Sequence, residues 1–264
     1  MNRTAFRFAL LLAALAMPLL AATAPAQTDR GREIARQIQQ NNRGYRDMSA
    51  EIRMTLRSAD GHETQREMRL RVLEREAANE GDLSMILFDS PGDVRGTALL
   101  SRAGVGSDDE QWLYLPALHR VRRISTSNMT GPFVGSEFSY EDITGGEVDK
   151  YDWRLLGEAA CGEEQCSQLE TRPRYSGSGY SRRVVLVDGQ HRVRSVEFFD
   201  RQDHRLKTLT YDDYRRFGRF WRSTRWTMVN HQNHKTTVLT LRNVRFGNGF
   251  SESDFTRAAL ERAR

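Results

Sequence analysis

Residues 47–74 read DMSAEIRMTLRSADGHETQREMRLRVLE, and this stretch decides the fold class. Apolar side chains occupy every second position on both sides of a central Asp60-Gly61, with polar or charged side chains between them. The apolar positions are Met48, Ala50, Ile52, Met54 and Leu56 before the turn, and Met68, Leu70 and Val72 after it. A period of two is typical of a strand with one buried face, and Asp-Gly is a preferred hairpin turn. The stretch therefore predicts two long antiparallel strands with one wet face.

The remainder of the chain continues this pattern, with turn sequences such as 90–93 and 188–191 between the apolar runs. Ten further strands are predicted at 83–89, 96–101, 111–115, 151–156, 167–172, 181–188, 193–200, 206–211, 220–230 and 235–246. One early helix is predicted at 31–43 from its helical apolar spacing. Residues 254–262 fit either a short helix or a segment that crosses the sheet edge, and 121–146 lacks a period and reads as a long loop.

No βαβ alternation, linker or internal repeat divides the chain, so a single mainly β (α+β) domain is expected. An antiparallel sheet of this many long strands must curl, which gives it a concave apolar face. Either a ligand or the protein's own side chains must fill that face. The pattern alone leaves both alternatives open.

The first 26 residues have the layout of a cleaved signal peptide. Arg3 and Arg7 precede an apolar stretch at 8–20, and Ala24-Pro25-Ala26 provides small residues for cleavage. The apolar stretch is shorter than the ~20 residues that a membrane-spanning helix needs. The mature chain is therefore expected to be an exported domain at 27–264, and its sequence contains no later segment apolar enough to span a membrane.

Charge and cysteine content exclude several classes of protein. The chain has 40 basic and 35 acidic residues, a mixed surface that argues against a general nucleic-acid binder. Cys161 and Cys166 are the two cysteines, and their close spacing in an exported protein favours a disulfide over a metal site.

Catalytic motifs are weak throughout the sequence. Gly135-Ser136 lacks the G-x-S-x-G spacing of a nucleophile elbow. His231 and His234 fall in a strand-and-turn region, where positions three apart point to opposite sides. No glycine-rich phosphate loop joins a strand to a helix. We therefore expect a protein without enzymatic activity, metal or cofactor.

Three blocks, taken in order, carry a resemblance to a known family. They are FDSPGDVRGTALL at 88–100, WLYLPALHRVRRI at 112–124 and GSEFSYED at 135–142. Together they resemble the periplasmic outer-membrane lipoprotein-sorting protein family of the LolA/LolB-like superfamily, in the branch associated with RND-type exporters. The resemblance implies a LolA-like fold, in which one curved antiparallel sheet forms an incomplete β-barrel lidded by short helices and loops.

The same resemblance implies a periplasmic, non-catalytic carrier. Its cavity would bind lipid or the acyl chains of lipoproteins during transport toward the outer membrane, with an inner-membrane exporter or an outer-membrane acceptor as further partners. The alternative is an accessory or sensor protein that docks an RND-type exporter or a signalling partner through its basic stripe. We expect a monomer in either case.

Two sets of residues are candidates for the site. The apolar set, expected in the cavity or its lid, is Met54, Leu56, Met68, Leu70, Leu113, Leu115, Phe133, Phe138 and Tyr140. The charged set is Arg120, Arg122, Arg123, Glu137, Glu141 and Asp142. The arginines could contact anionic headgroups, pair with these acids to hold a lid, or form a solvated face. Ordinary core packing is the alternative for the apolar set.

Overall fold

The computed structural model describes residues 24–75, 80–105, 107–144 and 147–262. The predicted signal peptide falls almost wholly outside these ranges, so its cleavage remains a prediction. Helix α1 occupies Ala24–Asn42 and begins seven residues earlier than the predicted helix. Its inner face, with Ala35 buried and Ile38 partly buried, packs toward the sheet.

Thirteen strands form one antiparallel sheet. They are β1 (Asp47–Arg57), β2 (Glu63–Leu73), β3 (Glu80–Ser90), β4 (Ala98–Gly104), β5 (Glu110–Leu115), β6 (Arg120–Arg123), β7 (Tyr151–Cys161), β8 (Glu164–Pro173), β9 (Arg182–Val187), β10 (Val193–Phe199), β11 (Arg205–Phe217), β12 (Phe220–Asn230) and β13 (Thr236–Phe246). Their order is β6-β5-β4-β3-β2-β1-β13-β12-β11-β10-β9-β8-β7.

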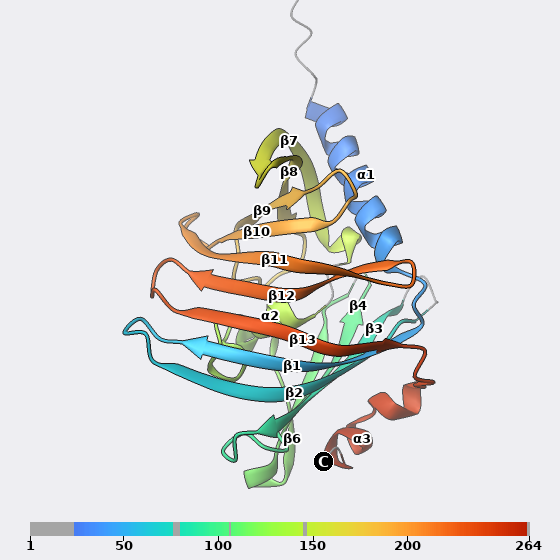
Figure 1. Ribbon diagram of the computed structural model, residues 1–264, viewed down its shortest axis with the longest axis vertical. Helices are drawn as coiled ribbons and strands as arrows, with labels where there is room; N and C mark the ends of the chain where they lie inside the picture. Colours follow the sequence, from blue (N-terminus) through green and yellow to red (C-terminus); the bar gives the residue numbers. More distant parts are fainter. Residues whose placement is uncertain (1–23, 76–79, 106, 145–146, 263–264) are drawn as a thin grey trace, which may run out of the picture.

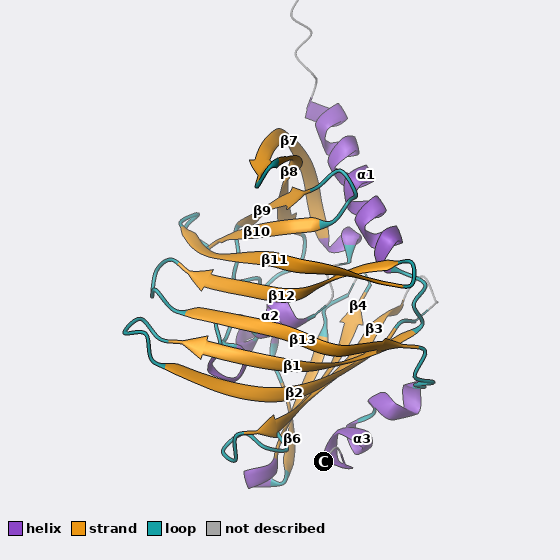
Figure 2. Cartoon of the chain, in the orientation of Figure 1, coloured by secondary structure: helices purple, strands orange, loops and turns teal. Residues whose placement is uncertain are grey.

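The sheet curls strongly but does not close, because β6 and β7 remain its two edges. Figure 1 shows β1, β2 and β11–β13 crossing the front while β3 and β4 run behind them, and α1 lies along one side near β7–β10. The few helices stand out against the strands in Figure 2. The predicted single curved antiparallel sheet, short of a closed barrel, is confirmed.

The first predicted hairpin has the expected register. Ile52 of β1 faces Met68 of β2 across the ladder, and Arg53 faces Glu67. Arg53 Nε donates to Glu67 Oε1 at 2.7 Å on the wet face, while Ile52 and Met68 are buried in the core. The period of two in the sequence thus becomes one buried and one charged face.

The segment expected to be a loop at 121–146 departs from expectation at its start. Arg120–Arg123 forms β6, which pairs with β5 and ends the sheet. A strand of four residues with three arginines gives no alternating apolar pattern, which is why the sequence did not reveal it. Short 3-10 turns and α2 (Tyr140–Ile143) follow.

Two apolar clusters cover opposite faces of the sheet. The larger cluster fills much of the concave face and includes residues from most strands. The smaller cluster lies behind β3–β5, where Trp112 and Tyr114 pack near Phe255 and Leu260. Leu260 belongs to α3 (Arg257–Arg262), so the C-terminal segment forms a short helix against the sheet, one of the two alternatives left open by the sequence.

Candidate functional site

The predicted lid aromatics lie inside the molecule. Phe133 and Phe138 are each 1% exposed, and the Phe133 ring lies 5.7 Å from the rings of both Phe88 and Tyr140. Met54 and Met68 belong to the same buried cluster. At this end of the concave face, the chain's own side chains therefore fill the space.

Other members of the predicted apolar set lie nearer the margin. Leu56, Leu70 and Leu113 are partly buried and pack against the large cluster. Leu115 is likewise of intermediate exposure at the end of β5. Of the nine predicted apolar residues, Leu70 is the one that lines the large cavity described next.

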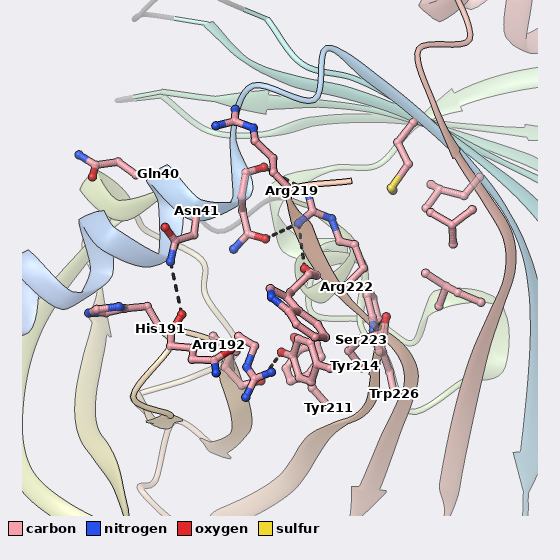
Figure 3. A pocket seen from close by; sticks show the side chains of 18 residues that line it. Gln40, Asn41, His191, Arg192, Tyr211, Tyr214, Arg219, Arg222, Ser223 and Trp226 are labelled. Atoms are coloured by element: carbon pink, nitrogen blue, oxygen red, sulfur yellow. Dashed lines mark hydrogen bonds between the residues drawn. The ribbon is translucent and has the colours of Figure 1, made fainter. Parts of the chain in front are cut away.

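The open space lies at the other end of the concave face, beneath the C-terminal part of α1. A cavity of about 720 Å³ separates that helix from the inner surface of β1, β2 and β11–β13. Figure 3 shows Tyr211, Tyr214 and Trp226 on the strand side, opposite Gln40 and Asn41 of the helix. Its apolar lining comes from Met48, Leu70, Val193, Tyr211, Trp226, Leu241 and Val244.

A second hollow of about 470 Å³ adjoins the first. The two share Asn42, Val193, Tyr211, Arg222 and Trp226 in their walls. The second hollow extends beneath α1 toward β7–β10, where its further apolar lining is Ile38, Val148, Trp153, Val185 and Val196. The two hollows together form a continuous lining of aliphatic and aromatic side chains under one helix.

Hydrogen bonds attach the end of α1 to the strands around the cavity mouth. Arg222 of β12 donates to the Asn42 side chain at 2.7 Å and to its carbonyl at 3.2 Å. Arg219 donates to the Arg43 carbonyl at 3.0 Å. These acceptors are neutral, and burial lowers the pKa of Arg222. Arg219 and Arg222 thus place two guanidinium groups at the cavity mouth.

Acidic side chains lie beneath α1 inside the second hollow. Glu147 accepts from Gln39 at 2.8 Å and pairs with Arg43 at 3.3 Å. Burial raises the pKa of Asp82 to about 6, and the nearby Glu147 adds to the rise. The Tyr45 hydroxyl donates to Asp82 at 3.4 Å. Glu147 thus joins α1 to the wall of the hollow through Gln39 and binds Arg43 just after the helix.

Comparison with known proteins assigns the family. A family model described as an uncharacterized protein matches residues 80–262, which is more than half of the chain. A domain described as an outer membrane lipoprotein-sorting protein domain, from Vibrio parahaemolyticus, is 39% identical with a TM-score of 0.85, over 89% of this chain and 99% of that chain. The chain belongs to the outer membrane lipoprotein-sorting protein family.

Two further solved structures share the fold. A DUF1329 family protein from Desulfovibrio piger is 29% identical with a TM-score of 0.84, over 89% of this chain and 99% of that chain. A LolA superfamily protein from Nitrosomonas europaea is 20% identical with a TM-score of 0.66, over 90% of this chain and 100% of that chain. No curated protein matches the chain.

In this member of the family, the arginines do not pair with the acids of the next block, which was one of the three alternatives that the sequence left open. Arg123 pairs with Glu110 at 2.8 Å on β5, and neither Arg120 nor Arg122 forms an ion pair with a described residue. All three are exposed on the edge strand β6, whose Val121 packs against the smaller apolar cluster.

The three acids instead hold the 125–144 segment against the sheet. Glu137 accepts from Asn230 at 2.7 Å, and Glu141 accepts from Tyr175 at 2.6 Å. Asp142 pairs with Lys207 at 2.6 Å, with both side chains nearly buried. The motif block at 135–142 thus holds a segment in place and does not line the cavity mouth.

The structure contains the predicted disulfide between Cys161 and Cys166, across the β7–β8 turn. Within the described ranges, no group of three His, Cys, Asp or Glu residues is arranged to hold a metal ion. No described helix is long and apolar enough to cross a membrane.

Sequence reasoning missed most of the cavity lining. Tyr211 and Trp226 sit on predicted strands, but nothing in their local pattern distinguishes a side chain facing a hollow from one facing packed core. Helix α1 decides the difference, because it stands away from the sheet where 125–144 does not fill it. The clustering of aromatics at 211–226 was the one available sign.

Proposed function

We propose that the protein is a periplasmic carrier that binds lipid, or the acyl chains of lipoproteins, beneath α1 and transports them toward the outer membrane. It performs no chemistry on its cargo. The observation that supports this proposal is the apolar cavity of about 720 Å³ under a helical roof, in a member of the lipoprotein-sorting family.

Hydrophobic burial provides the driving force. Small-molecule sites are typically ~300–1,000 Å³ and lined by apolar and aromatic side chains, a range that includes this cavity. Each methylene moved out of water contributes about 0.8 kcal/mol, so a single long acyl chain binds tightly. Release then requires either displacement of α1 or an acceptor with a more apolar site.

The cargo can be identified directly from purified protein. Native mass spectrometry and organic extraction of protein isolated from the periplasm should detect bound lipid or lipoprotein. Leu70→Glu places a carboxylate in the cavity lining and should abolish this copurification. Leu156→Glu makes the same change at a 39% exposed position of β7 and should retain it. An empty wild-type protein that takes up no added lipid would contradict the proposal.

Export is part of the same proposal. We expect cleavage after Ala26, so that the exported protein begins at Gln27. N-terminal sequencing of the periplasmic fraction tests this, and recovery of the full-length chain in the cytoplasm would contradict it.

Docking to an exporter is a second candidate function, favoured by the β5–β6 hairpin. Leu118 at its tip is 49% exposed, and the neighbouring Arg120 and Arg122 have no ion pair with a described residue. Charge reversal of Arg120 and Arg122 should abolish binding to an RND-type exporter while lipid binding persists. Unchanged exporter binding would exclude this role for the hairpin.

A further inference from the structure

The second hollow contains a half-buried arginine, Arg183, that forms no ion pair with a carboxylate of the described residues. Arg183 of β9 shares its inward face with Val185, and both line the hollow. Its Nε atom is buried and has no hydrogen-bond partner among the described residues. Thr171 lies directly opposite on β8, and its hydroxyl is also buried without a partner. Two unsatisfied polar atoms therefore lie on neighbouring strands in one wall of the hollow, next to the apolar side chains of Val185 and Val196.

The neighbours of Arg183 compensate its charge without a carboxylate in direct contact: burial opposes the charge, but Tyr151, Tyr175 and Glu141 outweigh burial and raise its pKa. Its guanidinium lies 4.0 Å from the centre of the Tyr151 ring, a stabilising contact that satisfies no N–H group by itself. Glu141 acts on it electrostatically, but that carboxylate already accepts from Tyr175 and from the Gly179 backbone. An arginine cannot escape by losing its proton, and buried charges in proteins are normally paired.

We propose that Arg183 and Thr171 form a subsite for an anionic oxyacid group, a carboxylate or a phosphate, at the head of the acylated ligand. This inference rests on the proposed carrier function and specifies its ligand class. A guanidinium binds such oxygens through two parallel N–H donors, and the Thr171 hydroxyl adds a third donor. The ligand thereby satisfies groups that the free protein leaves unpaired.

The position of the subsite fits an acyl chain attached to that head. From Arg183 the wall continues past Val185 and Val196 to Tyr211 and Trp226, which line both hollows. Tyr211 also brings a phenol hydroxyl to this path. Beyond it the larger cavity offers aliphatic lining for the tail.

The test compares three ligands with the same twelve-carbon chain. Dodecanoate, dodecyl phosphate and dodecanol each compete with the neutral fluorescent probe 1-N-phenylnaphthylamine for delipidated full-length mature protein at pH 7.5. At least one anion should displace the probe at a roughly ten- to a hundred-fold lower concentration than dodecanol, as a charge-assisted hydrogen bond predicts. The tighter of the two anions identifies a carboxylate or a phosphate head.

Variants assign the discrimination to the subsite. Arg183→Gln should reduce the ratio between anion and alcohol to about one. Arg182→Gln is the matched control, because this neighbour faces the other side of β9 and pairs with Asp203 at 2.7 Å. Thr171→Val preserves the shape of the side chain and should weaken anion binding several-fold. It should also leave the unliganded fold intact, so the test survives if Arg183→Gln does not fold.

The outcomes separate this inference from the carrier function. Equal displacement by all three ligands would overturn the subsite and leave the carrier intact. Discrimination that persists in both Arg183→Gln and Thr171→Val would also overturn the subsite. No displacement by any of the ligands would overturn both proposals.

Discussion

At the scale of single residues, Lys207 and Asp142 form a buried ion pair that holds the 125–144 segment. The two side chains are 5% and 3% exposed, and their N–O distance is 2.6 Å. Lys207 also donates to the Glu137 carbonyl at 2.9 Å, and Tyr180 donates to Asp142 at 2.8 Å. The pair therefore ties the 125–144 segment to β11 in the middle of the sheet.

We predict that Asp142→Asn destabilises the protein by about 3–5 kcal/mol, because it leaves the Lys207 charge buried and unpaired. Glu110→Gln removes the exposed partner of Arg123 and should cost less than about 1 kcal/mol. Urea unfolding of both variants provides the comparison, and similar losses would show that the buried pair has no special role.

The same carboxylate predicts a dependence of stability on pH. Burial raises the pKa of Asp142, but Lys207 and the hydrogen bonds outweigh it and hold the pKa below its usual value. Its contribution is complete above the unfolded pKa of about 4 and is lost as the pH falls through the folded value. Urea midpoints between pH 2 and 5 should fall steeply for the wild type and less steeply for Asp142→Asn.

Asp82 changes the stability of the protein with pH in the opposite direction. Its folded pKa of about 6 lies above the unfolded value of about 4, so the folded state binds the extra proton between these values. Stability is therefore lost as the pH rises from 4 to 6. Asp82→Asn should remove this loss and stabilise the protein by roughly 1–2 kcal/mol at pH 7.5.

Thermal unfolding across pH 4–8 measures the Asp82 effect. Asp149→Asn, at a 60% exposed carboxylate beside α1, is the control and should change the profile little. If Asp82→Asn were less stable than the wild type at pH 7.5, the ionised carboxylate would instead stabilise the fold beneath the helix.

At the scale of elements, α1 approaches β7 through a glycine. A Cβ at Gly31 would lie 2.8 Å from the Leu155 nitrogen and 2.9 Å from the Arg154 backbone. These are strand backbone atoms, which cannot rotate away as a side chain could. The close approach of Gly31 sets how α1 lies over the second hollow.

Gly31→Ala should therefore destabilise the protein by roughly 1–3 kcal/mol through this steric overlap. In a helix interior, a change from Gly to Ala normally stabilises the protein by up to about 1 kcal/mol. A loss of stability on Gly31→Ala would therefore point to the steric overlap. Arg30→Ala, at an exposed position of the same helix, is the control. Stabilisation by Gly31→Ala in thermal unfolding would show that α1 is not tightly docked on β7.

At the scale of the whole molecule, the curved sheet has two differently occupied halves. The 125–144 segment fills one half of the concave face with Phe133 and Phe138, and α1 covers a hollow in the other half. The packed half is filled by the chain's own side chains, while the hollow half exposes apolar lining that a ligand can cover. Ligand binding should therefore stabilise the entire domain.

A ligand that binds the folded state alone, present at a hundred times its Kd, adds about 2.7 kcal/mol. For a domain of this size that corresponds to a rise in Tm of roughly 5–11 °C. Differential scanning calorimetry of delipidated protein, with and without dodecanoate, measures it. Leu70→Glu should show no rise, and an equal rise in that variant would place binding outside the cavity.

Local sequence patterns were sufficient to predict the class of fold and the family. The alternation at 47–74 and in the later strands determines which side of each strand is buried, because side chains on a strand alternate strictly between faces. The three motif blocks indicated the lipoprotein-sorting family before any geometry was known. The disulfide was predicted from the close spacing of the two cysteines together with the signal-peptide pattern, and it is confirmed.

The position of the cavity and the partners of the buried charges depend on the tertiary structure. Phe133 and Leu241 both look apolar in sequence, yet one fills the concave face and the other borders a cavity. Asp142 pairs with Lys207 and not with an arginine, because the fold places β11 next to the 125–144 segment. Long-range contacts of this kind depend on the curvature of the whole sheet, which no local pattern encodes.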